Sequence, residues 1–176
     1  MKALIVIFAL SLIFLLTSCS KMEESTPVSP QVNPTSLSKA HPVPFQFTIE
    51  AVGQATQTSP VSVEMVMEGS GNATHVGKFT SISHNVSYFT SPTTGIIVNG
   101  THTTYSANGE EMYATYTGTF VISNGVGENT INFIFNGGTG RFENLYGEIQ
   151  AVIISHEPGQ LVQKHLTGSG SGYIIY

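Results

Sequence analysis

The chain has 176 residues and a formal net charge of −5, and only 10% of its residues are charged. The few basic residues form no cluster that could neutralise a row of phosphates, so nucleic acid is excluded as an expected partner. The single cysteine permits no internal disulfide, and a sequence without aspartate holds no Ser-His-Asp triad.

The N-terminus combines a basic residue, an apolar run and the lone cysteine. Lys2 precedes an apolar stretch at 3–16, which is too short to span a bilayer but typical of a secretory signal. The small residues before Cys19 resemble the lipobox of bacterial lipoproteins, in which the cysteine receives a diacylglyceryl group and cleavage occurs just before it. We therefore expect a cleaved signal peptide at 1–18 and a mature chain that begins at acylated Cys19.

Acylation at Cys19 implies that the partner is a membrane. Each buried methylene contributes about 0.8 kcal/mol, so two or three acyl chains such as palmitate hold a protein firmly. No aspartate follows the cysteine, which in lipoprotein sorting favours the bacterial outer membrane over the inner one. We expect a lipid-anchored protein there, facing the periplasm or the cell surface. The alternative is a plain secreted protein with a leftover cysteine.

Residues 19–44 are rich in Ser, Thr, Pro and Gln and contain few apolar side chains. Such a composition buries too little surface to fold and is typical of a flexible tether. The folded domain is therefore expected at 45–176.

Apolar and polar residues alternate along this domain with a period of two, which indicates strands with one apolar face. In chain order the strands are predicted at 45–51, 61–68, 77–89, 95–106, 110–122, 128–136, 145–155 and 161–176. Turn-forming pairs such as Ser91-Pro92 and Asn124-Gly125 separate them. We expect an all-β fold, a single antiparallel eight-stranded β-barrel, because closure removes the exposed strand edges; a β-sandwich is the alternative.

Two rows of glycine bear on the interior of such a barrel. Gly168, Gly170 and Gly172 share one face of the last strand, and Gly69 and Gly71 extend the apolar face of the second strand. These rows either leave space in the lumen for a small ligand or serve curvature alone in a filled barrel.

The run Gly-Gly-Thr-Gly-Arg-Phe at 137–142, followed by Gly147, resembles the signature of plant dirigent proteins and their relatives in the allene oxide cyclase-like barrel superfamily. Segments 73–79 and 108–111 are similar to pieces of its small secreted bacterial members. The resemblance implies an antiparallel eight-stranded barrel and a homo-oligomer. It implies no catalytic residue here, because the lumenal aspartate of dirigent proteins has no counterpart in this chain.

Two histidines are predicted to face each other inside the barrel. His84 shares a strand face with Ile82 and Val86, and His102 shares one with Ile96, so both are expected to point inward from neighbouring strands. A three-residue loop with Gly109 in the left-handed conformation would set His102 opposite Ala114 and keep it inward, whereas a two-residue turn would place it outward. The alternative without a site is one buried histidine that is hydrogen-bonded to a backbone group, or an exposed histidine without a role.

The candidate ligand-binding residues are His84, His102, Tyr116 and Arg141. Arg141 would either clamp an anionic ligand or pair with a glutamate such as Glu143. Two histidines are too few for a zinc site, so we expect no metal and no cofactor. The favoured function is a binding or interaction module for a small apolar ligand. The alternatives are a structural or adhesive surface protein with a filled barrel, and a cyclase- or dirigent-like enzyme.

Overall fold

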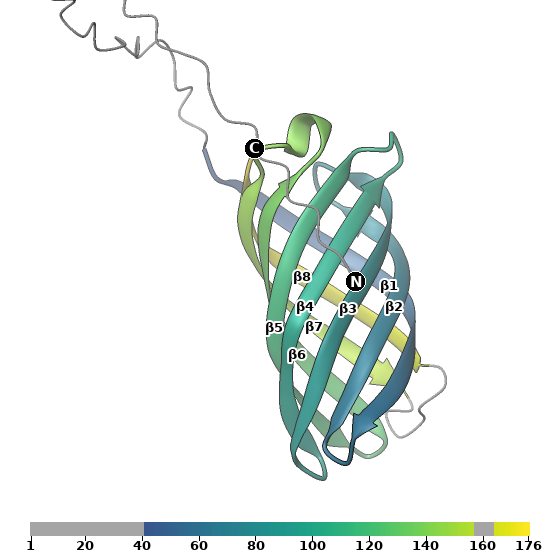
Figure 1. Cartoon of the computed structure of the whole chain (residues 1–176). Helices are drawn as coiled ribbons and strands as arrows, with labels where there is room; N and C mark the ends of the chain where they lie inside the picture. The colour runs from purple at the N-terminus through teal and green to yellow at the C-terminus, as the bar shows by residue number, and fades with distance from the viewer. Residues whose placement is uncertain (1–40, 157–163) are drawn as a thin grey trace, which may run out of the picture. The chain divides into compact units, whose positions relative to one another are not determined.

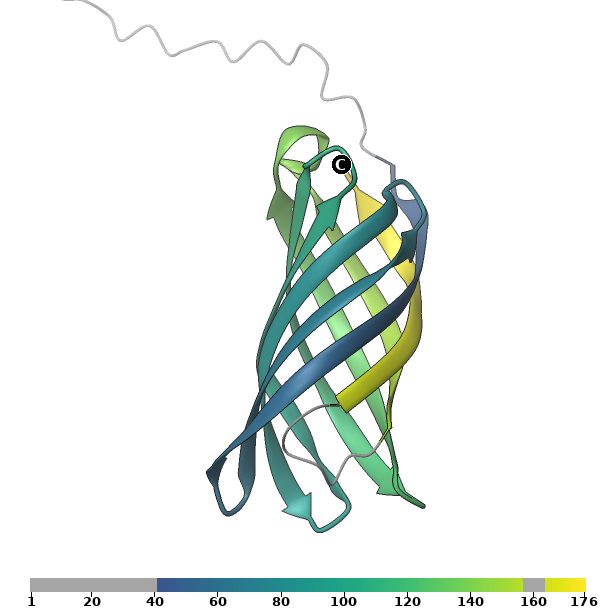
Figure 2. The same cartoon turned by 90° about the vertical axis from the view of Figure 1, so that its right-hand side faces the viewer.

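The strands close into a barrel in the computed structural model, which describes residues 41–156 and 164–176 (Figures 1 and 2). The strands are β1 (Val43–Ser59), β2 (Ser62–Ala73), β3 (Gly77–Ser91), β4 (Thr94–Ser106), β5 (Glu111–Ser123), β6 (Val126–Gly138), β7 (Tyr146–His156) and β8 (Lys164–Ile175). Each is antiparallel to the next, and β8 pairs with β1. The expected antiparallel eight-stranded barrel is confirmed, and the sandwich alternative is excluded.

Alternation of inward and outward side chains explains why these segments form strands. On β5, Met112, Ala114 and Tyr116 are buried, whereas Thr115 and Thr117 between and after them are exposed. β-Branched and aromatic residues suit such a half-buried pleated surface.

Residues with positive φ make the tight turns between strands. Asn124 and Gly125 have φ of 51° and 74°, as a two-residue hairpin turn requires. Gly109 has φ of 84°, and the loop around it pairs His102 with Ala114. The register expected from a three-residue loop is therefore confirmed.

A short 3₁₀ helix, η1 (Gly140–Phe142), joins β6 to β7 at the end of the barrel where β1 begins and β8 ends (Figure 1). β1 begins slightly before Phe45, the expected start of the domain. The expected signal peptide at 1–18, Cys19 and the tether as far as residue 40 lie outside the described residues. No helix within residues 41–156 and 164–176 is long and apolar enough to cross a membrane.

The half of the barrel next to η1 is densely packed, and we call it the filled half. Phe142 and Ile174 are 0% exposed and Met112 is 1% exposed. Phe142 packs edge-on against Tyr176, and the ring of Phe45 lies 5.9 Å from that of Phe135. Large side chains from the strands and from η1 therefore leave little open space in this half, where a void of only about 20 Å³ lies among Phe45, Phe79 and Phe135.

The opposite half, which carries the turns after β1, β3 and β5, is hollow. Its inward side chains Ile49, Met65, Met67, Phe89 and Ile122 keep part of their surface exposed although they point into the barrel. Inward side chains that remain partly exposed indicate unfilled space, and we call this part the hollow half.

Candidate functional site: a cavity in the hollow half

A cavity of about 350 Å³ occupies the hollow half. This volume lies within the range of about 300–1,000 Å³ that is usual for small-molecule sites. Gln57 lines the cavity and is also exposed, so the cavity reaches solvent at the end of the barrel opposite η1. Much of the wall is apolar and comes from every strand: Phe47, Ile49, Ala51, Val63, Met65, Met67, Phe89, Ile97, Phe120, Ile122, Ile131, Phe133, Ile153 and Leu166.

An aromatic layer separates the cavity from the filled half. Phe133 is its centre: its ring lies 5.0 Å from that of Tyr116, 5.3 Å from that of His102 and 6.1 Å from that of Phe47. All four side chains line the cavity. This layer forms the floor on which a bound molecule would rest, because aromatic side chains offer large rigid surfaces.

Strand β3 supplies a row of four polar residues to the wall. Ser81, Ser83, Asn85 and Ser87 point inward and line the cavity. The apolar residues between them point outward; Ile82 and Tyr88 are among the exposed large hydrophobic residues. The usual rule that the apolar face points inward is therefore reversed on β3 between Phe79 and Phe89.

This reversal makes the expected inward orientation of His84 wrong. His84 lies on the outer wall, where its Nε2 is 2.6 Å from Glu64 Oε1 on β2. It pairs with Thr101, whereas Ser83 is the residue opposite His102. The prediction failed because the hydroxyl and amide groups of β3 face a hollow lumen, so the apolar residues do not mark the inner face.

A bulge changes the inward face of β4 part of the way along the strand. The pairing of β4 with β5 shifts between Ile97 and Gly100, and Asn99 between them has φ of 53°. Ile97 is buried whereas Ile96 is exposed, which corrects the expectation that Ile96 shares the inward face. Beyond the bulge His102 points inward, as expected.

His102 is buried and hydrogen-bonded through both ring nitrogens. Its Nδ1 lies 2.6 Å from Ser83 Oγ, and its Nε2 lies 3.0 Å from Thr104 Oγ1. Burial lowers the pKa of His102 to about 4, because desolvation disfavours the imidazolium. The ring is therefore neutral near pH 7, and both nitrogens are engaged by protein hydroxyls.

Tyr116 is the end point of a second hydrogen-bonded group. Ser87 Oγ donates to Asn85 Oδ1 at 3.2 Å, and Asn85 Nδ2 donates to the phenolic oxygen of Tyr116 at 2.9 Å. Burial raises the pKa of Tyr116 to about 12, so the phenol keeps its proton. The glycine at position 100 leaves room for the Tyr116 ring, because a Cβ atom there would lie only 2.5 Å from Tyr116 Cγ.

Two further polar residues lie towards the open end of the cavity. Ser155 on β7 is 5% exposed, and its Oγ has no hydrogen-bond partner. Lys164 on β8 is half-buried, and burial lowers the pKa of its ammonium group. A buried hydroxyl without a hydrogen-bond partner is uncommon in proteins. The Ser155 hydroxyl therefore favours a bound molecule that offers it a hydrogen-bonding group.

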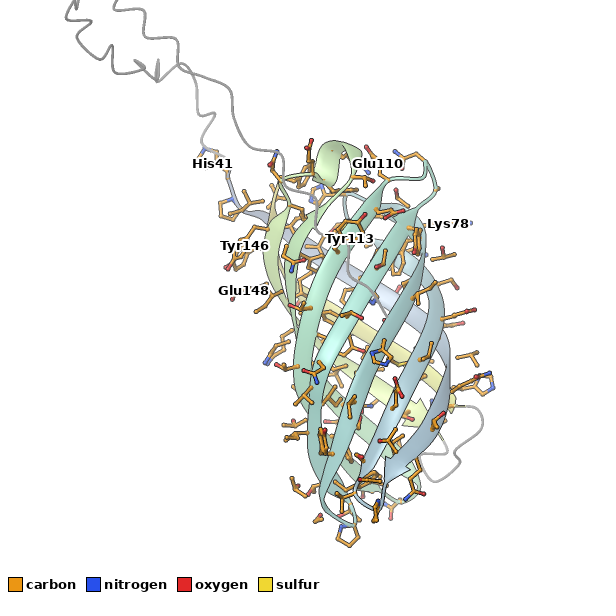
Figure 3. The ribbon with its side chains drawn as sticks, in the orientation of Figure 1. His41, Lys78, Glu110, Tyr113, Tyr146 and Glu148 are labelled. Carbon is orange, nitrogen blue, oxygen red and sulfur yellow. The ribbon has the colours of Figure 1, made fainter. Side chains whose placement is uncertain are left out.

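Arg141, expected as a ligand-binding residue, does not reach the cavity. It lies on η1 at the other end of the barrel, where its Nε is 3.0 Å from Glu110 Oε2. Its partner is thus Glu110 rather than the suggested Glu143. Figure 3 shows Glu110 at the η1 end and Tyr113 on the outer wall.

The structure brings two of the four candidates, His102 and Tyr116, together on the cavity floor and leaves His84 and Arg141 outside. Sequence reasoning missed Ser83, Asn85 and Ser155. The sequence does contain a signal for the inner face of β3. Phe79 and Phe89 lie at the two ends of the polar row at 81, 83, 85 and 87 and continue its period of two, so all six residues share one face.

Among the described residues, no three His, Cys, Asp or Glu side chains gather in a way that could hold a metal ion.

Comparison of the chain with protein-family models, with curated proteins and with solved structures finds no match. The resemblance of 137–142 to the dirigent glycine signature stays a prediction. The account of function therefore depends on the cavity itself.

Proposed function

We propose that this protein is a binding module that holds a small, mostly apolar molecule in the cavity of its hollow half. The observation that carries the proposal is the cavity of about 350 Å³ with its largely apolar wall. Transfer of apolar surface from water into such a site contributes about 25 cal/mol per Å², which is enough to hold a small molecule without charged contacts.

The hollow half favours a binder over the structural alternative. A purely structural or adhesive barrel gains stability from every inward side chain, because packed interiors are more stable than cavities. Here Phe135 and Phe142 fill one half, whereas Ser81, Ser83 and Ala51 leave the other half open.

The cavity also favours binding over a cyclase- or dirigent-like reaction. None of the cavity-lining residues in the described part of the chain is a carboxylate. His102 is the imidazole present, and its two nitrogens already bond Ser83 and Thr104. A general base needs a free lone pair directed at substrate, which this arrangement does not offer.

Titration with the neutral fluorescent compound N-phenyl-1-naphthylamine tests the proposal. Its fluorescence should rise on binding to the wild-type barrel, because the dye leaves water for an apolar site. The variant Met65→Trp fills the cavity from β2 and should weaken dye binding at least about tenfold, a loss of about 1.4 kcal/mol. Val66→Trp is the matched control, since the neighbouring Val66 is exposed on the outer wall.

Dye binding that is absent from the wild type, or equal in the two tryptophan variants, would contradict a lumenal site. The sequence contains no native tryptophan, so fluorescence of the new indole also reports whether Met65→Trp is shielded from solvent. Circular dichroism checks that both variants keep the barrel.

We also propose that the module acts at a bacterial outer membrane through acylated Cys19. The support is the sequence pattern at 1–19, a basic residue, an apolar run and a lone cysteine. Wild-type protein should begin at Cys19, incorporate labelled palmitate and partition into detergent. Cys19→Ala should lose both properties, and a mature N-terminus elsewhere would refute the anchor.

A further inference from the structure

Three polar side chains of the cavity form a series of hydrogen bonds that runs in one direction, from Ser87 through Asn85 to Tyr116. Ser87 donates to Asn85, and Asn85 donates to Tyr116, so the amide oxygen of Asn85 and the phenolic oxygen of Tyr116 each already receive a hydrogen. The phenolic hydrogen of Tyr116 is the last donor of the series. Hydrogen bonds in such a series polarise one another and strengthen the final donor.

Tyr116 is 3% exposed and lines the cavity. A buried hydroxyl is costly when its hydrogen has no acceptor, and water or a ligand must then supply one. On the wall formed by β7, the buried Oγ of Ser155 has no hydrogen-bond partner and likewise requires one. The cavity is thus apolar in bulk but holds buried hydroxyls whose bonding is incomplete.

We infer that the ligand is an uncharged, mostly apolar molecule with a carbonyl oxygen, such as a ketone, ester or quinone, and that the Tyr116 hydroxyl donates a hydrogen bond to that oxygen. The inference rests on the proposed binding function and specifies the chemistry of the same cavity. A carbonyl is the complement of this site, because it accepts a hydrogen bond and needs to donate none.

A carboxylate fits the floor poorly. An ionised group buried away from water requires a paired charge, and its cost is otherwise large. Lys164 is the only lysine or arginine among the described residues that line the cavity, and it lies at the start of β8, towards the open end rather than on the floor that carries Tyr116. His102 is neutral near pH 7 and cannot supply the charge.

Three ligands of one chain length test the inference: 2-decanone, decane and decanoate at neutral pH. Each is measured by its displacement of N-phenyl-1-naphthylamine from the full-length protein. Wild type should bind 2-decanone more tightly than decane or decanoate. Tyr116→Phe removes the hydroxyl and keeps the ring, so it should weaken 2-decanone about tenfold and leave decane unchanged.

Tyr113→Phe is the matched control. Tyr113 lies on the same strand but on the outer wall, where its hydroxyl donates to Glu111 at 2.6 Å (Figure 3). This variant should leave the affinities for all three ligands unchanged. Ser155→Ala serves as a second comparator: if it abolishes the preference for the ketone and Tyr116→Phe does not, the assignment of the donor is wrong.

A spectroscopic measurement on the wild type keeps the inference testable if Tyr116→Phe does not fold. The carbonyl carbon-13 resonance of labelled 2-decanone should move downfield on binding, relative to the ketone in an alkane solvent, because a hydrogen bond polarises the carbonyl. A resonance at the alkane position would overturn the inference. So would equal binding of ketone and decane, or tighter binding of decanoate. Failure of the dye itself to bind would instead refute the proposed function.

Discussion

The two halves of this barrel share their strands but differ in what those strands place inside. Near η1 the interior holds fully buried side chains such as Phe142, Met112 and Ile174. At the other end the same strands present Ser83, Asn85 and partly exposed methionines to a cavity of about 350 Å³. The packed side chains of the filled half stabilise the barrel, and the open space of the hollow half is the site that we propose for a ligand.

The largest expected effect is on stability, and it is tested by comparing the loss of one phenylalanine from each half of the barrel. Phe142→Ala leaves a closed void in the filled half and should lower the free energy of unfolding by about 3–5 kcal/mol. Phe89→Ala in the hollow half should cost clearly less, because Phe89 already keeps exposed surface and borders open space. Urea denaturation of both variants measures the difference. Equal losses would remove the distinction between the halves.

The next effect is a dependence of stability on pH that arises at the cavity floor. The pKa of His102 is about 4 in the folded barrel and about 6.5 in the unfolded chain. The unfolded chain therefore binds the proton first as the pH falls. Stability contributed by neutral His102 is complete above about pH 6.5, and about 3 kcal/mol of it should be lost by about pH 4.

Urea midpoints of wild type and His102→Gln, compared between neutral and acid pH, isolate this contribution from that of the glutamates. The variant should lose less stability on acidification than the wild type. His84→Gln is the matched control: it replaces a histidine of the outer wall and leaves His102 and its hydrogen bonds in place, so the loss that His102 causes should remain. A wild-type dependence that survives in His102→Gln would show that another group causes it.

The smallest effect concerns the hydroxyl groups of the cavity wall. Ser155→Ala removes an Oγ that has no partner, so the ligand-free protein should be as stable as the wild type or slightly more stable. Ser87→Ala removes the donor to Asn85 and should destabilise by about 1 kcal/mol. The two thermal midpoints separate these outcomes. A clear loss of stability in Ser155→Ala would mean that its hydroxyl is satisfied by water.

The sequence predicts the barrel well because period-two alternation and turn pairs act locally. The Gly109 loop is an example: the three-residue form, one of the two loops that the sequence allows there, places His102 opposite Ala114 as observed. The inner face of β3 was harder, since the rule that apolar residues point inward assumes a filled core. On β3 the lumen is hollow, so Ile82 faces outward and Ser83 faces inward.

The site was less predictable because it depends on register and on space. The Asn99-Gly100 pair within β4 is a recognisable sign of a bulge, and that bulge decides that Ile97 and His102 share the interior. No local pattern reports an unfilled volume, because it results from short side chains contributed by strands far apart in the sequence. The bond between Asn85 and Tyr116 likewise joins two strands that are not neighbours.

Methionine methyl resonances test the central claim most directly. Met65 and Met67 line the cavity in the hollow half, whereas Met112 is buried in the filled half. In protein labelled with carbon-13 at the methionine methyl groups, addition of N-phenyl-1-naphthylamine should shift the Met65 and Met67 resonances and leave Met112 in place. Unmoved Met65 and Met67 signals, or an equal shift at Met112, would contradict a binding site in the hollow half.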